Sequence, residues 1–247
     1  GMSFDESLSF AQENGYAEAD PVYDIEGIDA AHKIAILSNI IFGSPLPPDN
    51  FLIEGISKIT KEDIHIAEKL GFTVKHISSA DIRDGKILMR SNPALVKKTD
   101  YLSSLKNVRN ALVIDTDLVG KIHISSIGAG GEATAAGVIS DIVHLASGLK
   151  SFNAQSREDL DYRDLTDEFF SYLVTVHSAN ENTNNHIQKI LEEHNISIIN
   201  SGLINNVKQS YITYYYEIDE IASVALEGFS KDLLNITDNF KMLRIEK

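Results

Sequence analysis

Asp29 and Lys33 stand four residues apart in segment 25–42, whose apolar residues predict one long helix. Residues at that spacing lie about 40° apart around a helix axis, so both side chains face the same way. A carboxylate next to an ammonium group can hold it in place for proton transfer. The pair also fits an ordinary exposed ion pair, which stabilises a helix by roughly 0.3–0.5 kcal/mol.

Further carboxylates precede this helix in the sequence. Glu18 and Asp20 lie in a polar turn that Pro21 separates from any helix. Asp24 stands just before the expected helix, where a carboxylate can also cap free backbone N–H groups. We therefore expect three or four carboxylates to converge near Lys33, on a helix that its apolar face holds in place.

These residues belong to a longer pattern that runs from Ala11 to Lys33. It reads Ala-x3-Gly-Tyr-Ala-x2-Asp-Pro-x2-Asp-Ile-x-Gly-x-Asp-x3-Lys. The pattern resembles the signature of the homoserine dehydrogenase family, and every fixed position of that signature is present. A looser similarity continues through Glu54-Gly55-Ile56 to Gly128-Ala129-Gly130. The resemblance covers about residues 3–148.

The resemblance implies a role for each matched residue. Lys33 is similar to the catalytic lysine, which gives or takes the proton on the reacting oxygen, and Asp29 to the carboxylate beside it, which binds substrate and positions the lysine. The substrate-binding residues implied are Glu18 and Asp24, which would hold an ammonium group, with Tyr16 and Gly15 in the same turn. The activity implied is the NAD- or NADP-dependent interconversion of L-homoserine and L-aspartate 4-semialdehyde, in threonine and methionine biosynthesis.

The glycine run at Gly128–Gly131 has two interpretations. Gly128-x-Gly130-x-x-Ala133 formally fits a dinucleotide-binding fingerprint, but no second βαβ strand with a terminal acid follows it. It can be a flexible turn between strand and helix. The resemblance instead implies that Gly128 and Gly130 border the cofactor. Ala133 stands where the family usually has proline.

Composition excludes several function classes. The net charge of −14 would repel phosphate backbones, so we expect no nucleic-acid partner. Cysteine is absent, which excludes disulfides and thiolate sites and fits a cytoplasmic location. The eight histidines show no metal-binding spacing, and no apolar run reaches the ~18 residues of a membrane helix. We expect neither a metal nor a membrane.

Periodicity predicts an α+β fold with a mixed sheet in the first part of the chain. Helices are expected at residues 3–14, 25–42, 60–70 and 132–146, and strands at 72–82, 86–90, 111–116 and 121–127. Asp84-Gly85 is a strong hairpin signal, and Thr60 is the expected N-cap of the helix at 60–70. We assign residues 1–149 to a catalytic and dimerisation domain and the polar stretch 150–168 to a linker.

Residues 169–247 read as a second domain with the order βαββαβ, typical of a ferredoxin-like fold. Strands are expected at 170–177, 196–203, 209–217 and 240–245, and helices at 184–194 and 219–234. This domain resembles an ACT domain, which can bind threonine. The usual Asp-x-Pro-Gly turn is replaced by residues 178–183, so a structural or dimerising role is equally consistent.

Two functions follow from this sequence. The first is the catalytic part of a homoserine dehydrogenase, acting on a small-molecule substrate and forming a homodimer. The family's nucleotide-binding domain is not in this chain, so we expect no activity from it alone, unless a separate chain supplies that domain. Gly1 before Met2 resembles a tag-removal remnant, and the sequence leaves open whether the domain is missing from the gene. The second is a non-catalytic amino-acid-binding, regulatory or dimerising module.

Overall fold

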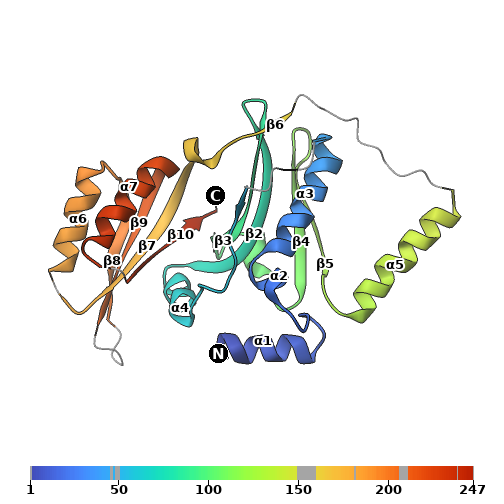
Figure 1. The fold of residues 1–247 in the computed structure, drawn as a ribbon, viewed down its shortest axis with the longest axis horizontal. Helices are drawn as coiled ribbons and strands as arrows, with labels where there is room; N and C mark the ends of the chain where they lie inside the picture. Colours follow the sequence, from blue (N-terminus) through green and yellow to red (C-terminus); the bar gives the residue numbers. More distant parts are fainter. Residues whose placement is uncertain are drawn as a thin grey trace.

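The computed structural model describes residues 2–44, 47, 51–148, 160–180, 182–205, 211–237 and 239–246 (Figure 1). Its α-helices are α1 (Phe4–Glu13), α2 (Val22–Ile25), α3 (Ile28–Phe42), α4 (Lys61–Lys69), α5 (Gly131–Ala146), α6 (Thr183–Glu193) and α7 (Ser223–Leu234). Its strands are β1 (Leu52–Ile53), β2 (Phe72–Arg83), β3 (Lys86–Lys97), β4 (Arg109–Thr116), β5 (Gly120–Ile127), β6 (Asp161–Tyr162), β7 (Phe169–Ser178), β8 (Ile198–Asn205), β9 (Ile212–Ala222) and β10 (Phe240–Ile245). Short 3-10 turns, η1 (Tyr101–Ser104) and η2 (Leu165–Asp167), complete the fold, which is α+β as predicted.

Strand β3 joins the two halves of the chain into one mixed sheet. One edge of β3 pairs along its length with β2, and the other edge pairs in turn with β6, β1 and β10, all parallel. The described sheet continues from β10 through β7 and β9 to β8. The predicted domains at 1–149 and 169–247 therefore share a sheet.

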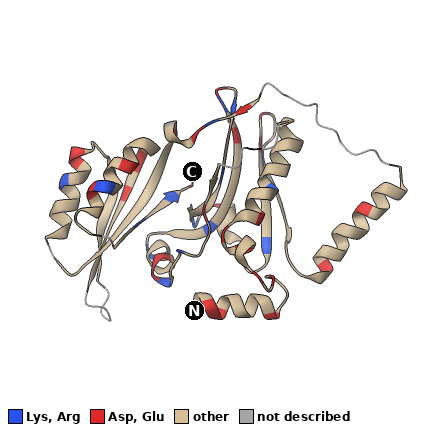
Figure 2. Cartoon of the chain, viewed as in Figure 1, with Lys and Arg blue, Asp and Glu red and all other residues tan. Residues whose placement is uncertain are grey.

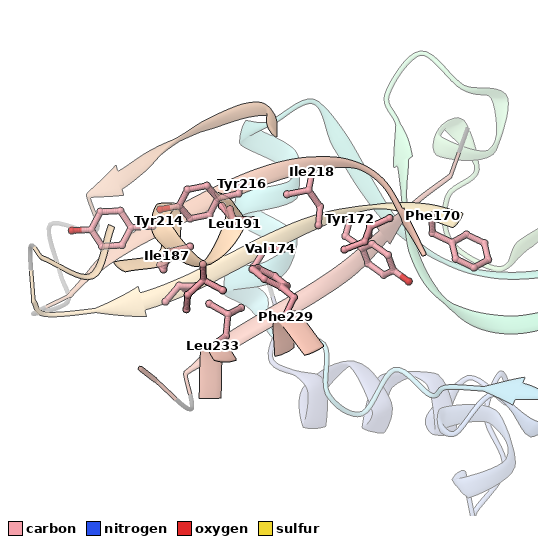
Figure 3. Packing of buried hydrophobic residues seen from close by; sticks show 13 residues of the cluster. Phe170, Tyr172, Val174, Ile187, Leu191, Tyr214, Tyr216, Ile218, Phe229 and Leu233 are labelled. Carbon is pink, nitrogen blue, oxygen red and sulfur yellow. The ribbon is translucent and has the colours of Figure 1, made fainter. Parts of the chain in front are cut away.

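The C-terminal unit has the predicted βαββαβ order. Its strands run β10-β7-β9-β8, all antiparallel, and α6 and α7 cover one face (Figure 1). Figure 3 shows its core, in which side chains from both helices pack between strand residues. The fully buried or nearly buried members include Tyr172, Val174, Ile187, Leu191, Tyr214, Tyr216, Ile218, Phe229 and Leu233. Burial raises the pKa of Tyr216, whose hydroxyl donates to Asn184 Oδ1 at 2.5 Å.

Helices α3 and α4 pack against the hairpin of the N-terminal half. Ala35 of α3 contacts a cluster with Ile87 and Met89 of β3, while Ile66 and Ala67 of α4 pack with Leu95 and Phe72 of the hairpin. Asp84 and Gly85 both have positive φ, as a tight hairpin turn requires, and Thr60 caps α4 as predicted.

Four described elements of the N-terminal half, α1, β4, β5 and α5, contribute no buried residue to a core. Strands β4 and β5 form a separate two-stranded sheet, and all residues of β5 are exposed. No residue of α1 or α5 is buried in the described structure. In Figure 1, α5 extends away from the rest of the chain. None of the described helices is long and apolar enough to cross a membrane.

Several predicted boundaries were wrong. Strand β3 does not end near residue 90 but continues to Lys97 through Pro93, which lies between the stretches that pair with β1 and β10. Helix α3 begins at Ile28, and residues 219–222 extend β9 instead of starting α7. Most of the predicted linker lies outside the described residues. Its end is packed, because β6 pairs with β3 and Arg163 binds Glu168 at 2.6 Å.

Candidate active site

Helix α3 places Asp29 and Lys33 on one face, as predicted. Lys33 Nζ lies 2.6 Å from Asp29 Oδ2, so the ammonium donates a short hydrogen bond within an ion pair. The side chains are 60% and 47% exposed. Below them, Ala31, Ala35 and Ser38 are buried against the rest of the protein. The helix is anchored by its buried face and presents the pair to solvent.

The turn after α1 carries Gly15, Tyr16 and Glu18. Gly15 has φ +68°, and the next amide, that of Tyr16, donates to Ala11 O at 2.8 Å, which closes the helix end. Gln12 Nε2 then donates to the backbone carbonyl of Glu18 at 2.9 Å. The backbone of the turn is thus fixed by α1, whereas the Glu18 side chain is exposed.

Asp24 does not cap α3, which corrects the sequence interpretation. It lies inside the short helix α2, where its side chain is exposed. The N-cap of α3 is Gly27, with φ +76° and no side-chain capping bond. The sequence pattern could not separate α2 from α3, because their joint apolar spacing reads as one helix.

Gly27 is held by residues that the sequence did not assign to the site. A Cβ atom at Gly27 would lie 2.8 Å from His76 Nε2 and 3.2 Å from Glu54 O, so only glycine fits. His76 Nε2 also lies 3.0 Å from Glu54 O. A Cβ at Gly55 would overlap the carbonyl of Ile25. These backbone contacts fix where α3 begins.

The turn at Gly128–Gly131 lies next to the turn after α1. A Cβ at Gly130 would lie 3.7 Å from Tyr16 Cε1, so the ring stands beside that glycine. Gly130 has φ 107° and ψ 154°, a conformation essentially restricted to glycine, and it caps α5. A Cβ at Gly128 would overlap the side chain of Asn110. The backbone conformation thus requires glycine at position 130, whereas a side chain at position 128 would first have to displace Asn110.

Three comparisons with known proteins bear on this arrangement. A sequence model of the family described as homoserine dehydrogenase matches residues 1–143. The homoserine dehydrogenase of Helicobacter pylori is 31% identical over 99% of this chain and 59% of its own length. That of Pseudomonas aeruginosa is 40% identical over 61% of this chain and 35% of its own.

The chain belongs to the homoserine dehydrogenase family. A crystal structure of a homoserine dehydrogenase from Thiobacillus denitrificans superposes with a TM-score of 0.82 at 28% identity, over 100% of this chain and 59% of the other. The family resemblance and the α+β fold with a mixed sheet are thus confirmed. The chain spans between about a third and three fifths of the length of these relatives.

Within this family member, Lys33 is the first lysine or arginine of the sequence. The acids that precede it are Asp5, Glu6, Glu13, Glu18, Asp20, Asp24, Glu26 and Asp29. Figure 2 shows this acidic segment from α1 to α3, with the basic position on α3. An excess of carboxylates in one segment of the chain favours a ligand that itself carries positive charge.

The structure brings two pairs of the predicted residues together, Lys33 with Asp29 and Tyr16 with Gly130. The carboxylates of Glu18 and Asp24 are exposed, and their convergence on Lys33 stays a prediction. No group of three or more potential metal ligands occurs among the described residues. A groove of about 510 Å³ lies elsewhere, between α6 and the segment after α7, and is lined by Ser178, His186, Lys189 and Asn235 among others.

Proposed function

We propose that this chain is the substrate-binding and catalytic part of a homoserine dehydrogenase that interconverts L-homoserine and L-aspartate 4-semialdehyde. The observation that carries the proposal is the 2.6 Å contact of Lys33 with Asp29, within a complete family signature. The reaction belongs to threonine and methionine biosynthesis, and the cysteine-free chain fits the cytoplasm.

Lys33 and Asp29 would act on the reacting oxygen. A bound nicotinamide, NAD or NADP, supplies or accepts the hydride at the aldehyde carbon. In the direction of reduction, the Lys33 ammonium stabilises the charge that develops on the oxygen and then protonates it. Asp29 keeps Nζ in place by its hydrogen bond. In the direction of oxidation, Lys33 accepts the same proton.

Glu18 and Asp24 would bind the substrate at its α-ammonium group. Both residues are exposed, so a ligand can reach their carboxylates from solvent. Hydrogen bonds between an ammonium group and carboxylates are among the stronger contacts available to a small ligand. Tyr16 and Gly15, in the same turn, would close one side of the substrate.

Gly128 and Gly130 would border the cofactor, and their lack of side chains suits close approach by a bulky group. The described residues contain no nucleotide-binding βαβ unit with a parallel sheet of its own. We therefore propose that the chain is inactive alone and needs a nucleotide-binding part, either joined to it or supplied by a separate chain.

The exposed apolar residues of the N-terminal half support a homodimer. Ile122 and Ile124 of β5 are exposed, as are Ile139 and Ile142 of α5. Burying such surface between subunits would remove it from water. Light scattering should give a mass near twice 27.3 kDa, and a mass near 27.3 kDa at all concentrations would contradict the dimer.

Turnover tests the proposed function. The chain should be joined to the nucleotide-binding part of the H. pylori relative and assayed for L-homoserine-dependent reduction of NAD and NADP. We expect turnover from the fusion, none from the chain alone, and a loss of about a hundredfold or more in Lys33→Met. Lys86→Met, on the hairpin far along the sequence, is the matched control and should retain activity. A fusion whose turnover survives Lys33→Met would overturn the assignment.

A further inference from the structure

We propose that Arg244, at the far end of the sequence, is a positioning residue for α3 and acts through the Glu54 carboxylate. The inference rests on the proposed function for its catalytic meaning. Its structural content, a contact route from the C-terminal unit to the start of the helix that carries Lys33, is independent of that function.

The Arg244 side chain is fixed on the sheet. It is 13% exposed, and its guanidinium carbon lies 5.1 Å from the centre of the Phe170 ring and 5.8 Å from that of Tyr172. Arg244 Nε donates to the Tyr172 hydroxyl at 3.2 Å. Stacking on two rings leaves the planar guanidinium little freedom to turn.

The position of Arg244 makes Glu54 its counter-charge. The nearby Arg90 stacks on the same Phe170 ring at 5.3 Å, but it forms a bidentate pair with Glu246 at 2.6 and 2.9 Å. Arg244 Nη1 is buried, makes no hydrogen bond in the described structure, and lies 3.8 Å from Glu54 Oε2. A guanidinium that is only 13% exposed is stabilised by a nearby negative charge, and the half-exposed Glu54 carboxylate supplies one.

The backbone of Glu54 connects this pair to α3. Glu54 N donates to Ser91 O at 2.8 Å, and Glu54 O lies 3.0 Å from His76 Nε2. Gly27 packs against both this carbonyl oxygen and the His76 ring. Two residues further, Ile56 N donates to Ile25 O at 2.8 Å. A displacement of Glu54 is therefore passed directly to the residues that precede α3.

The start of α3 depends on this junction because the helix has no side-chain cap. Gly27 is its N-cap, and Gly27 O accepts the first helical bond, from Ala31 N at 3.0 Å. Lys33 and Asp29 lie within the first two turns of the same helix. Without a capping side chain, the contacts with Glu54 and His76 are what hold the end of the helix in register.

Amide hydrogen exchange of the chain, followed by NMR, tests the route without any need for catalysis. In Arg244→Met we expect the amides of Ala31, His32 and Lys33 to exchange about three- to tenfold faster, relative to core amides of β9. Glu54→Gln should reproduce this effect, and the double variant should add little to either. Arg244→Lys, which keeps the charge but loses the planar stack, should restore part of the protection.

Arg90→Met is the matched control, because Arg90 shares the Phe170 ring but pairs with Glu246. It should raise exchange across β3 and β10 without a selective effect on α3. Unchanged α3 exchange in both Arg244→Met and Glu54→Gln would overturn the proposal, as would purely additive effects in the double variant. In the active fusion, Arg244→Met should lower kcat. An inactive wild-type fusion with the expected exchange would instead reject the proposed function and keep the route.

Discussion

The C-terminal unit and the candidate active site differ in what holds them. The unit encloses a core in which Phe229 and Leu233 of α7 are completely buried (Figure 3). The candidate site instead consists of the exposed faces of α2 and α3 and the turn after α1. The fold and the proposed chemistry therefore depend on different residues. Substitutions should separate stability from function.

The largest loss of unfolding free energy is expected from a substitution in the C-terminal core. Phe229→Ala leaves a cavity under a side chain that is 0% exposed, and should lower the free energy of unfolding by about 3–5 kcal/mol. Urea unfolding followed by circular dichroism measures this. Leu145→Ala, at a side chain of α5 that is 79% exposed, is the control and should leave unfolding nearly unchanged. Equal effects of the two changes would contradict the claim that stability resides in the buried C-terminal core and not in the exposed helices of the N-terminal half.

The next largest loss of stability is expected where the two halves of the chain join, at the ion pair of Arg90 with Glu246. Glu246→Gln removes the carboxylate that binds the buried Arg90 in a bidentate pair, and should cost about 1.5–3 kcal/mol. The double variant Arg90→Met with Glu246→Leu should recover part of that loss, because it removes the buried charge as well. The midpoints of urea unfolding for the single and double variants measure both changes in stability. A double variant less stable than Glu246→Gln would contradict the reasoning.

A smaller difference in the free energy of unfolding is expected between substitutions at Thr60 and Ser3, which cap α4 and α1 with the same capping-box hydrogen bonds. Thr60 caps α4, which packs Ile66 and Ala67 into the core, so Thr60→Ala should cost about 1 kcal/mol. Ser3 caps α1 with the same geometry, but α1 buries no residue in the described structure. Ser3→Ala should fray α1 with little change in global unfolding. If both substitutions shifted the unfolding midpoint alike, α1 would have to be part of the cooperative core.

Local patterns allowed much of this to be predicted. The hairpin at Asp84-Gly85, the cap at Thr60 and the strand at 240–245 each depend on neighbouring residues, and the structure confirms all three. The contact of Lys33 with Asp29 likewise follows from helix geometry alone.

Other features could not be predicted because they depend on residues far apart in the sequence. Nothing near Glu54 or His76 shows that both pack on Gly27, and the pairing of β10 with β3 joins residues about 150 positions apart. From the sequence alone, Gly27 could be recognised only as a fixed position of the family signature. Its tertiary reason, the close approach of Glu54 O and His76, appears only in the fold.

The exposed face of α3 and the turns before it form the proposed ligand site. The most direct test is an NMR titration of the isotope-labelled chain with L-homoserine, in which amide shifts are mapped onto the sequence. We predict that the shifts concentrate in residues 15–33 and at Gly130. Shifts that instead cluster around Ser178, His186 and Asn235, in the groove beside α6, or no shifts at millimolar homoserine, would contradict the claim.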